Sequence, residues 1–216
     1  MSRTALSARL LSALLVGALP AAASLPAAAA PAAAAAPVVV APSSAAPQPM
    51  TMNTNITEAQ VLQAQRTWCE ALLSISRAYR SGGVNQARAA ASKVIDGAYG
   101  YAYGPVAFKP TLTSGQQTFR PTRDGALAYF VGGDPRFPSD SGFALKPWEK
   151  CAIRNQVLQL HGDLAITMGN VDLTDSSGKV TTVDKTWSFL REPDGEIRIL
   201  LHHSSLPYQP APAARP

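Results

Sequence analysis

The sequence is poor in the residues and motifs that mark nucleic-acid binding, metal binding and the common cofactor folds. Its 216 residues include two cysteines and three histidines, and only 15% are charged. The formal charge of +5 comes without a run of Lys or Arg, which argues against a nucleic-acid partner. No nucleophile elbow, phosphate loop, dinucleotide fingerprint or haem-attachment motif occurs. These absences exclude the enzyme classes that depend on such motifs.

Long apolar runs are also missing. The run from Leu10 to Leu19 has about ten residues, whereas a transmembrane helix needs about twenty. Arg3 and Arg9 precede the run, and alanine triplets that resemble cleavage sites follow it. Residues 1–30 are therefore predicted to be a cleavable signal peptide, with a retained membrane anchor as the alternative. We expect the mature protein to be periplasmic or secreted and to make no membrane contact.

The composition divides the rest of the chain into a tether and one domain. Residues 26–49 are almost wholly Ala, Pro, Val and Ser, which cannot bury a core and favour extended, solvated chain. We therefore predict a disordered linker over 31–52 and a disordered tail over 210–216. Residues 53–209 remain, and this length supports one hydrophobic core.

Helices are predicted at the start of this domain. Thr57 and Gln60 form a capping-box pattern, and an apolar stripe at helical spacing follows them. The segment Ser81-Gly82-Gly83 is predicted to end this first helix, and the Ala-rich segment 85–98 to form a second one.

The second half of the domain is predicted to be a sheet. A loop with a short strand over 101–117 and a short helix over 122–131 lead into it. Turn signals then separate four β-rich runs, at residues 148–161, 164–174, 179–191 and 197–208. This spacing indicates an antiparallel meander, and helices followed by a sheet define the α+β class. A curved meander under helices leaves a cavity between the layers, where function is expected.

The two cysteines, Cys69 and Cys151, fall on a predicted helix and a predicted strand. An exported protein meets an oxidising environment, in which the pair could form a disulfide. Their positions in the sequence do not decide whether their Cα atoms come close enough, so buried free thiols are the alternative.

The last strand carries the side chains best placed for chemistry. Because side chains alternate along a strand, Leu200, His202 and Ser204 are predicted to share one face. An imidazole and a hydroxyl two residues apart on a cavity-facing strand can together hold a small polar ligand. The alternative is a polar patch at the strand end or at a subunit interface.

A metal site finds little support in the sequence. His202 and His203 are adjacent on a strand and point to opposite faces, while His161 belongs to a turn. Zinc catalysis usually needs three convergent ligands, and no acidic cluster suggests Mg²⁺ or Mn²⁺. We therefore expect no metal cofactor.

Three stretches carry a resemblance to a known family. They are FKPTLTSGQQTFRPTRDGALAYFVGG, TMGNVDLTDSSGKVTTVDKTWSF and the C-terminal HHSSLPY. The last is similar to the association domain of calcium/calmodulin-dependent kinase II, within the nuclear-transport-factor-2-like (SnoaL-like) superfamily. Together the three resemble the secreted proteins assigned to the iota class of carbonic anhydrases, over about residues 55–208.

The resemblance implies a conical α+β fold, a homodimer packed through its sheets, and reversible hydration of CO₂ to bicarbonate. In members described as metal-free, a threonine, a tyrosine, a histidine and a serine line the cavity, and they match Thr111, Tyr129, His202 and Ser204. Some members carry a further histidine where this chain has Leu201. Zinc or manganese is described for other members, and the missing histidine favours the metal-free alternative.

The same resemblance suggests a role for each residue. Thr111 and Tyr129 would position a water, while Ser204 and His202 would orient CO₂ and the forming bicarbonate. A histidine titrates near 6.5 and a tyrosine near 10, so His202 is predicted to be the general base or proton shuttle. Two alternatives without catalysis are a periplasmic module that binds another small ligand, and an assembly domain that forms oligomers through its sheet.

Overall fold

The computed structural model describes residues 54–210. The predicted signal peptide, the linker and all but the first residue of the tail lie outside the described residues. The helices and strands follow one another as α1 (Glu58–Ala98), β1 (Ala107–Lys109), α2 (Arg123–Val131), β2 (Trp148–His161), β3 (Leu164–Asp175), β4 (Val180–Arg191) and β5 (Ile197–Ser205). This order confirms the predicted α+β class.

The first helix begins as the sequence predicts. The Thr57 hydroxyl accepts a hydrogen bond from the Gln60 backbone N–H, and the Gln60 side chain accepts one from the Thr57 N–H. This reciprocal capping box satisfies two backbone donors that the first turn would leave unpaired.

The predicted end of that helix at Ser81-Gly82-Gly83 is confirmed. Two helical segments meet at a kink at Gly83, and the label α1 covers both of them. Only Gly83 has non-helical angles, with φ 71° and ψ −167°, a conformation that a residue without Cβ adopts at little cost. The kink changes the direction of the second half of α1, which ends at Ala98 with Tyr99 as its C-cap.

The sheet has the strand order β1-β5-β4-β3-β2. Strands β2 to β5 pair antiparallel with their neighbours in sequence, which confirms the predicted meander. The short strand β1 adds a parallel pair at the edge, with Phe108 opposite His202. The sheet is therefore mixed, and the prediction of a short strand did not include this pairing.

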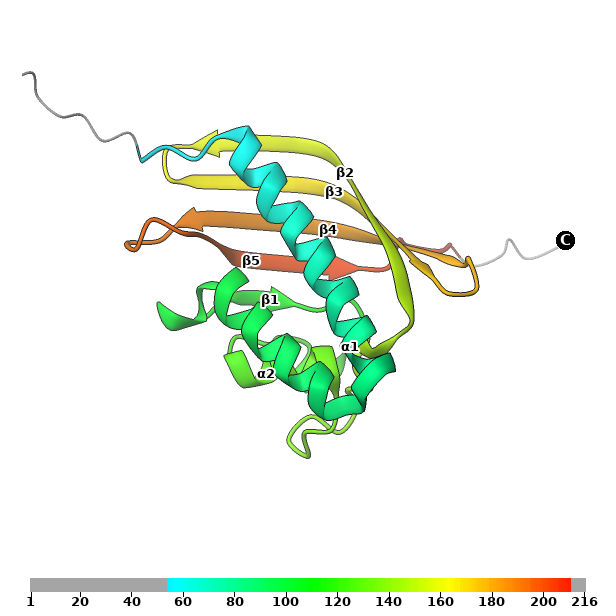
Figure 1. Ribbon diagram of the computed structural model, residues 1–216. Helices are drawn as coiled ribbons and strands as arrows, with labels where there is room; N and C mark the ends of the chain where they lie inside the picture. Colours follow the sequence, from blue (N-terminus) through cyan, green and yellow to red (C-terminus); the bar gives the residue numbers. More distant parts are fainter. Residues whose placement is uncertain (1–53, 211–216) are drawn as a thin grey trace, which may run out of the picture. The chain divides into compact units, whose positions relative to one another are not determined.

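Both helices pack on one face of this sheet. Figure 1 shows α1 crossing the face and α2 lying beside it, near the edge strand β1. The core between the layers is rich in aromatic residues, including Trp68, Tyr99, Phe108, Trp187 and Phe189. Each fully buried side chain of this size contributes about 1.5–3 kcal/mol to folding. None of the helices in residues 54–210 combines the length and apolar character needed to cross a bilayer.

A disulfide joins Cys69 on α1 to Cys151 on β2. Their Cα atoms are 5.5 Å apart, and 82 residues separate them in the sequence. Of the two alternatives that the sequence left open, the structure therefore has the disulfide. The bond fixes the first half of α1 to the far edge strand of the sheet.

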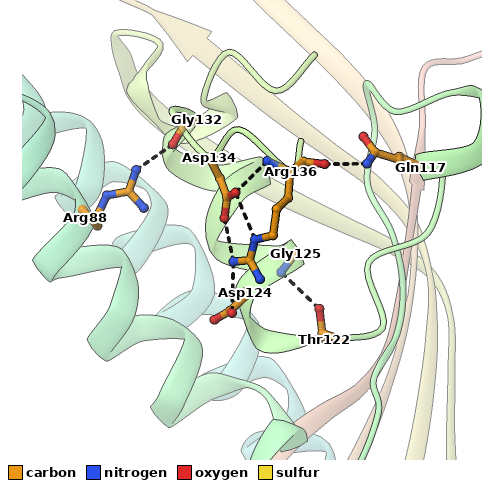
Figure 2. Close-up of polar contacts among 8 residues, drawn as sticks. All are labelled: Arg88, Gln117, Thr122, Asp124, Gly125, Gly132, Asp134 and Arg136. Carbon is orange, nitrogen blue, oxygen red and sulfur yellow. Dashed lines mark hydrogen bonds and ion pairs between the residues drawn. The ribbon is translucent and has the colours of Figure 1, made fainter. Parts of the chain in front are cut away.

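The short helix α2 confirms its predicted bounds and is held at both ends (Figure 2). At its start, the Thr122 hydroxyl accepts a hydrogen bond from the Gly125 N–H. At its end, the Arg88 guanidinium of α1 donates to the Gly132 carbonyl at 2.7 Å. Arg136 in the following loop donates to the carboxylates of Asp124 and Asp134, at 3.1 and 2.8 Å. These contacts fix the orientation of α2, and with it the position of Tyr129.

Candidate active site

His202 lies on β5 and is completely enclosed, with 2% of its surface exposed. Both ring nitrogens have partners. Nδ1 is 2.9 Å from the Tyr99 hydroxyl oxygen, and Nε2 is 2.8 Å from Nζ of Lys185. The Tyr99 oxygen also accepts a hydrogen bond from Nε1 of Trp68 at 3.0 Å. The imidazole is therefore one link in a chain of four hydrogen-bonded side chains.

The predicted alternation along β5 holds at the site but fails before it. His202 and Ser204 are both buried toward the helices, whereas His203 is exposed. Leu200 was predicted to share the face of His202, but it is 36% exposed and Ile199 is buried instead. The cause is a β-bulge, because the register with β4 shifts between Ser188 and Phe189 and leaves Leu200 as the extra residue.

Ser204 meets Thr111 across the edge of the sheet. Their hydroxyl oxygens are 2.6 Å apart and buried. Thr111 lies two residues after the end of β1, so the parallel pairing of β1 with β5 brings the two hydroxyls together. Nζ of Lys109 donates to the Ser204 carbonyl at 2.8 Å and braces the same junction.

Tyr129 projects from α2 into the core, with 5% of its surface exposed. Its ring packs edge-on to Phe108 and stacks on Phe143, with centroid separations of 5.8 and 5.5 Å. The hydroxyl makes no hydrogen bond of normal geometry among the described residues, but the Thr111 side chain and the backbone of Thr111 and Leu112 are close enough to lower its pKa. Burial is the larger effect and raises the pKa of Tyr129, so the hydroxyl keeps its proton. An unpaired buried hydroxyl is costly and indicates a position for a ligand.

Phe108 connects the two sides of the site. Its ring centroid is 4.6 Å from that of His202 and 5.8 Å from that of Tyr129. The four residues predicted from the resemblance are therefore all buried on the helix-facing side of the sheet. Thr111 and Ser204 are in direct contact, and Tyr129 and His202 flank the same phenylalanine.

The sequence analysis missed Lys185, which is 4% exposed. It lies on β4 directly opposite Ser204, so both side chains point to the same face. Burial lowers the pKa of its amine from the usual 10.5 to about 7. The signal was present, because strand alternation places Lys185 on the same face as Val183 and Trp187, both core residues.

Burial also lowers the pKa of His202 well below 6.5, with smaller effects from Lys185 and His203. The imidazole is therefore neutral near pH 7. Tyr99 is enclosed as well, and burial raises its pKa well above 10. At neutral pH the hydrogen-bonded chain contains a phenol, a neutral imidazole and an amine.

A groove of about 500 Å³ opens between the two halves of α1 and the strands β4 and β5. Its lining includes Phe189, Arg191 and Ile199, but none of the four predicted residues. This groove is therefore not the predicted cavity that the four residues were expected to line, because it lies apart from the polar cluster. Within residues 54–210, no three His, Cys, Asp or Glu side chains gather as they would around a metal ion.

The family of metal-independent carbonic anhydrases matches residues 59–206. The match covers well over half of the chain, so the protein belongs to this family. Membership confirms the predicted carbonic anhydrase class and the expected absence of a metal cofactor.

Individual relatives agree with this assignment. A metal-independent carbonic anhydrase from Nostoc sp. (strain PCC 7120) is 57% identical over 158 residues, which cover 73% of this chain and 77% of that protein. The crystal structure of an iota-carbonic anhydrase from a cyanobacterium, complexed with bicarbonate, superimposes with a TM-score of 0.74 and 55% identity. That match covers 76% of this chain and 99% of the other. A nuclear transport factor 2-like superfamily protein from Salmonella enterica also matches, with a TM-score of 0.41 and 13% identity. That match covers 71% of this chain and 97% of the other.

Proposed function

We propose that the protein hydrates CO₂ reversibly to bicarbonate at the cluster of Thr111, Tyr129, His202 and Ser204. The observation that carries this assignment of residues is the Tyr129 hydroxyl, which is buried beside the Thr111–Ser204 pair and makes no hydrogen bond of normal geometry. The bicarbonate complex of the cyanobacterial relative supports an oxygen-rich anion as the missing partner.

The hydroxyl pair can supply a second donor. In the 2.6 Å contact, one of Thr111 and Ser204 donates to the other, so the accepting hydroxyl keeps a free hydrogen. Together with the Tyr129 hydrogen, this makes two donors for oxygens on which negative charge develops. Donors fixed in advance in a dry site stabilise such charge more than water does.

His202 lies two residues from Ser204 on the same face, and its two ring nitrogens contact Tyr99 and Lys185, so it is proposed to act through these partners. Its predicted role as general base or proton shuttle requires a nitrogen that can exchange a proton. Because both nitrogens are occupied, any proton that His202 accepts must involve Tyr99 or Lys185.

The test is stopped-flow CO₂ hydration by purified protein after exhaustive chelation. We expect activity in the wild type and a loss of about 100-fold in Tyr129→Phe, the size of effect seen when one preorganised donor is removed. Tyr79→Phe, at an exposed position on α1, is the matched control and should keep wild-type activity. No hydration above the uncatalysed rate in the wild type would refute the proposed function.

We also propose that two copies associate through the outward face of the sheet. Exposed apolar side chains at Val157 and Met168 lie in register with each other there, and Met168 aligns through Thr186 with the outward-facing His203. Light scattering on the wild type and Met168→Glu tests this proposal. A monomeric wild type would contradict it, as would a dimer that the glutamate leaves intact.

The protein is further proposed to act in the periplasm or outside the cell. The disulfide between Cys69 and Cys151 supports an oxidising compartment. N-terminal sequencing of protein recovered from fractionated cells gives the measurement. Mature chains that begin after residue 20 and lie outside the cytoplasm are expected, and full-length cytoplasmic protein would refute the export.

A further inference from the structure

Lys185 is a buried amine without an acidic partner. Its side chain forms no salt bridge among residues 54–210, and its only hydrogen bond is the one to His202. Aromatic rings enclose it instead, with Nζ 4.5 Å from the centroid of Trp68 and 5.2 Å from that of Trp187. A lysine so placed is rare, because burial penalises its charged form unless a carboxylate compensates.

The hydrogen bonds around His202 allow two arrangements of its proton. Nε1 of Trp68 can only donate, so the Tyr99 oxygen accepts from it, and in the first arrangement the Tyr99 hydroxyl donates to Nδ1 of His202. A neutral imidazole that accepts at Nδ1 carries its hydrogen on Nε2, which points at Nζ of Lys185. An ammonium has no lone pair to accept that hydrogen. In this first arrangement Lys185 is therefore a neutral amine.

In the second arrangement, the other tautomer of His202 lets Lys185 donate a hydrogen bond. When His202 carries its hydrogen on Nδ1, it donates to the Tyr99 oxygen, and Nε2 accepts an N–H from Lys185. The lone pair of the neutral amine is then free. In that arrangement the Tyr99 hydrogen loses its partner, which favours a return to the first arrangement once the amine has released an added proton.

We propose that Lys185 is the proton acceptor of CO₂ hydration and that His202 and Tyr99 position its amine. The inference rests on the proposed function and on the register of the sheet, which puts Lys185 directly opposite Ser204. Side chains opposite each other in an antiparallel pair have Cβ atoms about 5 Å apart. The side chain of Lys185 thus starts opposite Ser204, and the imidazole of His202 holds its amine.

In the proposed step, water adds to CO₂ and Lys185 takes up the proton that the water loses. An electron pair of the water oxygen forms the bond to the carbon of CO₂, and one C=O pair moves onto its oxygen. One O–H bond of the water breaks, and its proton joins the lone pair of Nζ. The products are bicarbonate and the Lys185 ammonium, which loses its proton to solvent or buffer before the next turnover.

The aromatic surroundings explain why the amine can take a proton and release it. The faces of Trp68 and Trp187 stabilise a cation by about 0.5–2 kcal/mol, less than a buried carboxylate would. A carboxylate partner would raise the pKa of the amine and keep it protonated, whereas burial lowers the pKa of Lys185 to about 7. A proton acceptor works best when its pKa is close to the working pH.

Few other groups facing the amine titrate in this range. On β5, His202 contacts the amine, and burial puts the pKa of His202 well below 6.5. At the end of α1, Tyr99 contacts the other side of the His202 ring, and burial puts the pKa of Tyr99 well above 10. From α2, Tyr129 faces the same cluster with a raised pKa. From β1, Lys109 lies at the Ser204 carbonyl, and burial lowers its pKa only partly. A rate change centred near pH 7 would therefore report Lys185.

The experiment compares Lys185→Met and Lys185→Arg with the wild type and with Lys179→Met, an exposed lysine in the β3–β4 turn. We expect kcat to fall about 100-fold in both Lys185 variants, the size of effect that removal of a general base produces. The arginine variant is informative because a guanidinium can donate to Nε2 of His202 but cannot lose a proton. Urea denaturation of both variants checks that they fold, and a merely structural lysine would be replaced by methionine without loss of kcat.

Three further readouts separate this inference from its alternatives. The wild-type kcat should rise with pH through about 7, the Lys185→Met profile should be flat there, and imidazole buffer should restore part of the lost rate. Heteronuclear NMR of the wild type should show a lysine side chain that titrates near 7 and is missing in Lys185→Met. Wild-type kcat in either Lys185 variant, or titration of Lys185 near 10, would overturn the inference. An inactive wild type would instead refute the proposed function, and the NMR titration of Lys185 would remain measurable.

Discussion

The hydroxyl oxygens of Thr111 and Ser204 lie 2.6 Å apart, although 93 residues separate them in the sequence. The contact depends on β1, a strand of three residues that pairs in parallel with β5 and puts Phe108 opposite His202. One short edge strand therefore joins the hydroxyl pair to the imidazole. Each of the following predictions changes one member of this arrangement or of the scaffold that holds it.

Thr111→Val should remove the hydroxyl while keeping the shape of the side chain. Ser204 then has no hydroxyl partner, and one donor to the developing bicarbonate is lost, so kcat/KM should fall about 100-fold. Thr111→Ser keeps the hydroxyl and should retain most of the activity. Equal losses in the two variants would mean that the methyl group, and not the hydroxyl, is required.

Tyr129→Phe should lower activity without lowering stability. Its hydroxyl is buried and makes no hydrogen bond of normal geometry, so its removal should leave the free energy of unfolding unchanged or raise it by about 1 kcal/mol. Tyr101→Phe is the comparison, because the Tyr101 hydroxyl donates to the Arg120 carbonyl at 2.9 Å. That variant should lose about 1 kcal/mol in urea denaturation. A similar loss in Tyr129→Phe would show that its hydroxyl has a structural partner.

The stability of the wild type should rise between pH 7 and 9. The pKa of Lys185 is lowered to about 7 in the folded protein and is near 10.5 in the unfolded chain. Between these values the unfolded chain binds one proton more, so the free energy of unfolding increases with pH by up to about 1.4 kcal/mol per unit. Urea denaturation at several pH values measures this slope.

Lys185→Met is the control for that slope. Since the variant has no amine at this position, its stability should vary less over the same pH range. Parallel curves for the wild type and Lys185→Met would mean that Lys185 is charged in the folded protein, contrary to the expectation.

Replacing both cysteines by serine should destabilise the domain. The disulfide between Cys69 and Cys151 closes a loop of 82 residues, and native disulfides of this kind contribute about 2–5 kcal/mol. Denaturation of the double variant beside the oxidised wild type gives the difference. Activity at low temperature should persist, because the polar cluster of the site does not include these residues. A difference near zero would indicate that the bond adds little to the packing of α1 on β2.

The sequence predicted the parts of the fold that depend on neighbouring residues. The capping box at Thr57, the helix over 122–131 and the four-stranded meander all follow from signals within a few residues of each other. The bulge at Leu200 was not predictable in this way, since an extra residue in a strand is visible only from the register of its partner.

The candidate site was predicted in part. Alternation along one strand was enough to put His202 and Ser204 on the same face, and the family resemblance supplied Thr111 and Tyr129. Lys185 was missed because a lysine in a strand is normally read as solvent-exposed. Its importance depends on a contact with His202, and that contact crosses between two strands.

The sequence by itself determined the order of the elements, the inward face of the last strand and the family to which the chain belongs. Periodicity, caps and turns act over short stretches, and each can be recognised without knowing the rest of the chain. The tertiary structure alone decided the parallel pairing of β1, the disulfide and the contact between Lys185 and His202. These depend on distances between residues far apart in the chain and on the exclusion of water around them, and both arise only when the helices pack on the sheet.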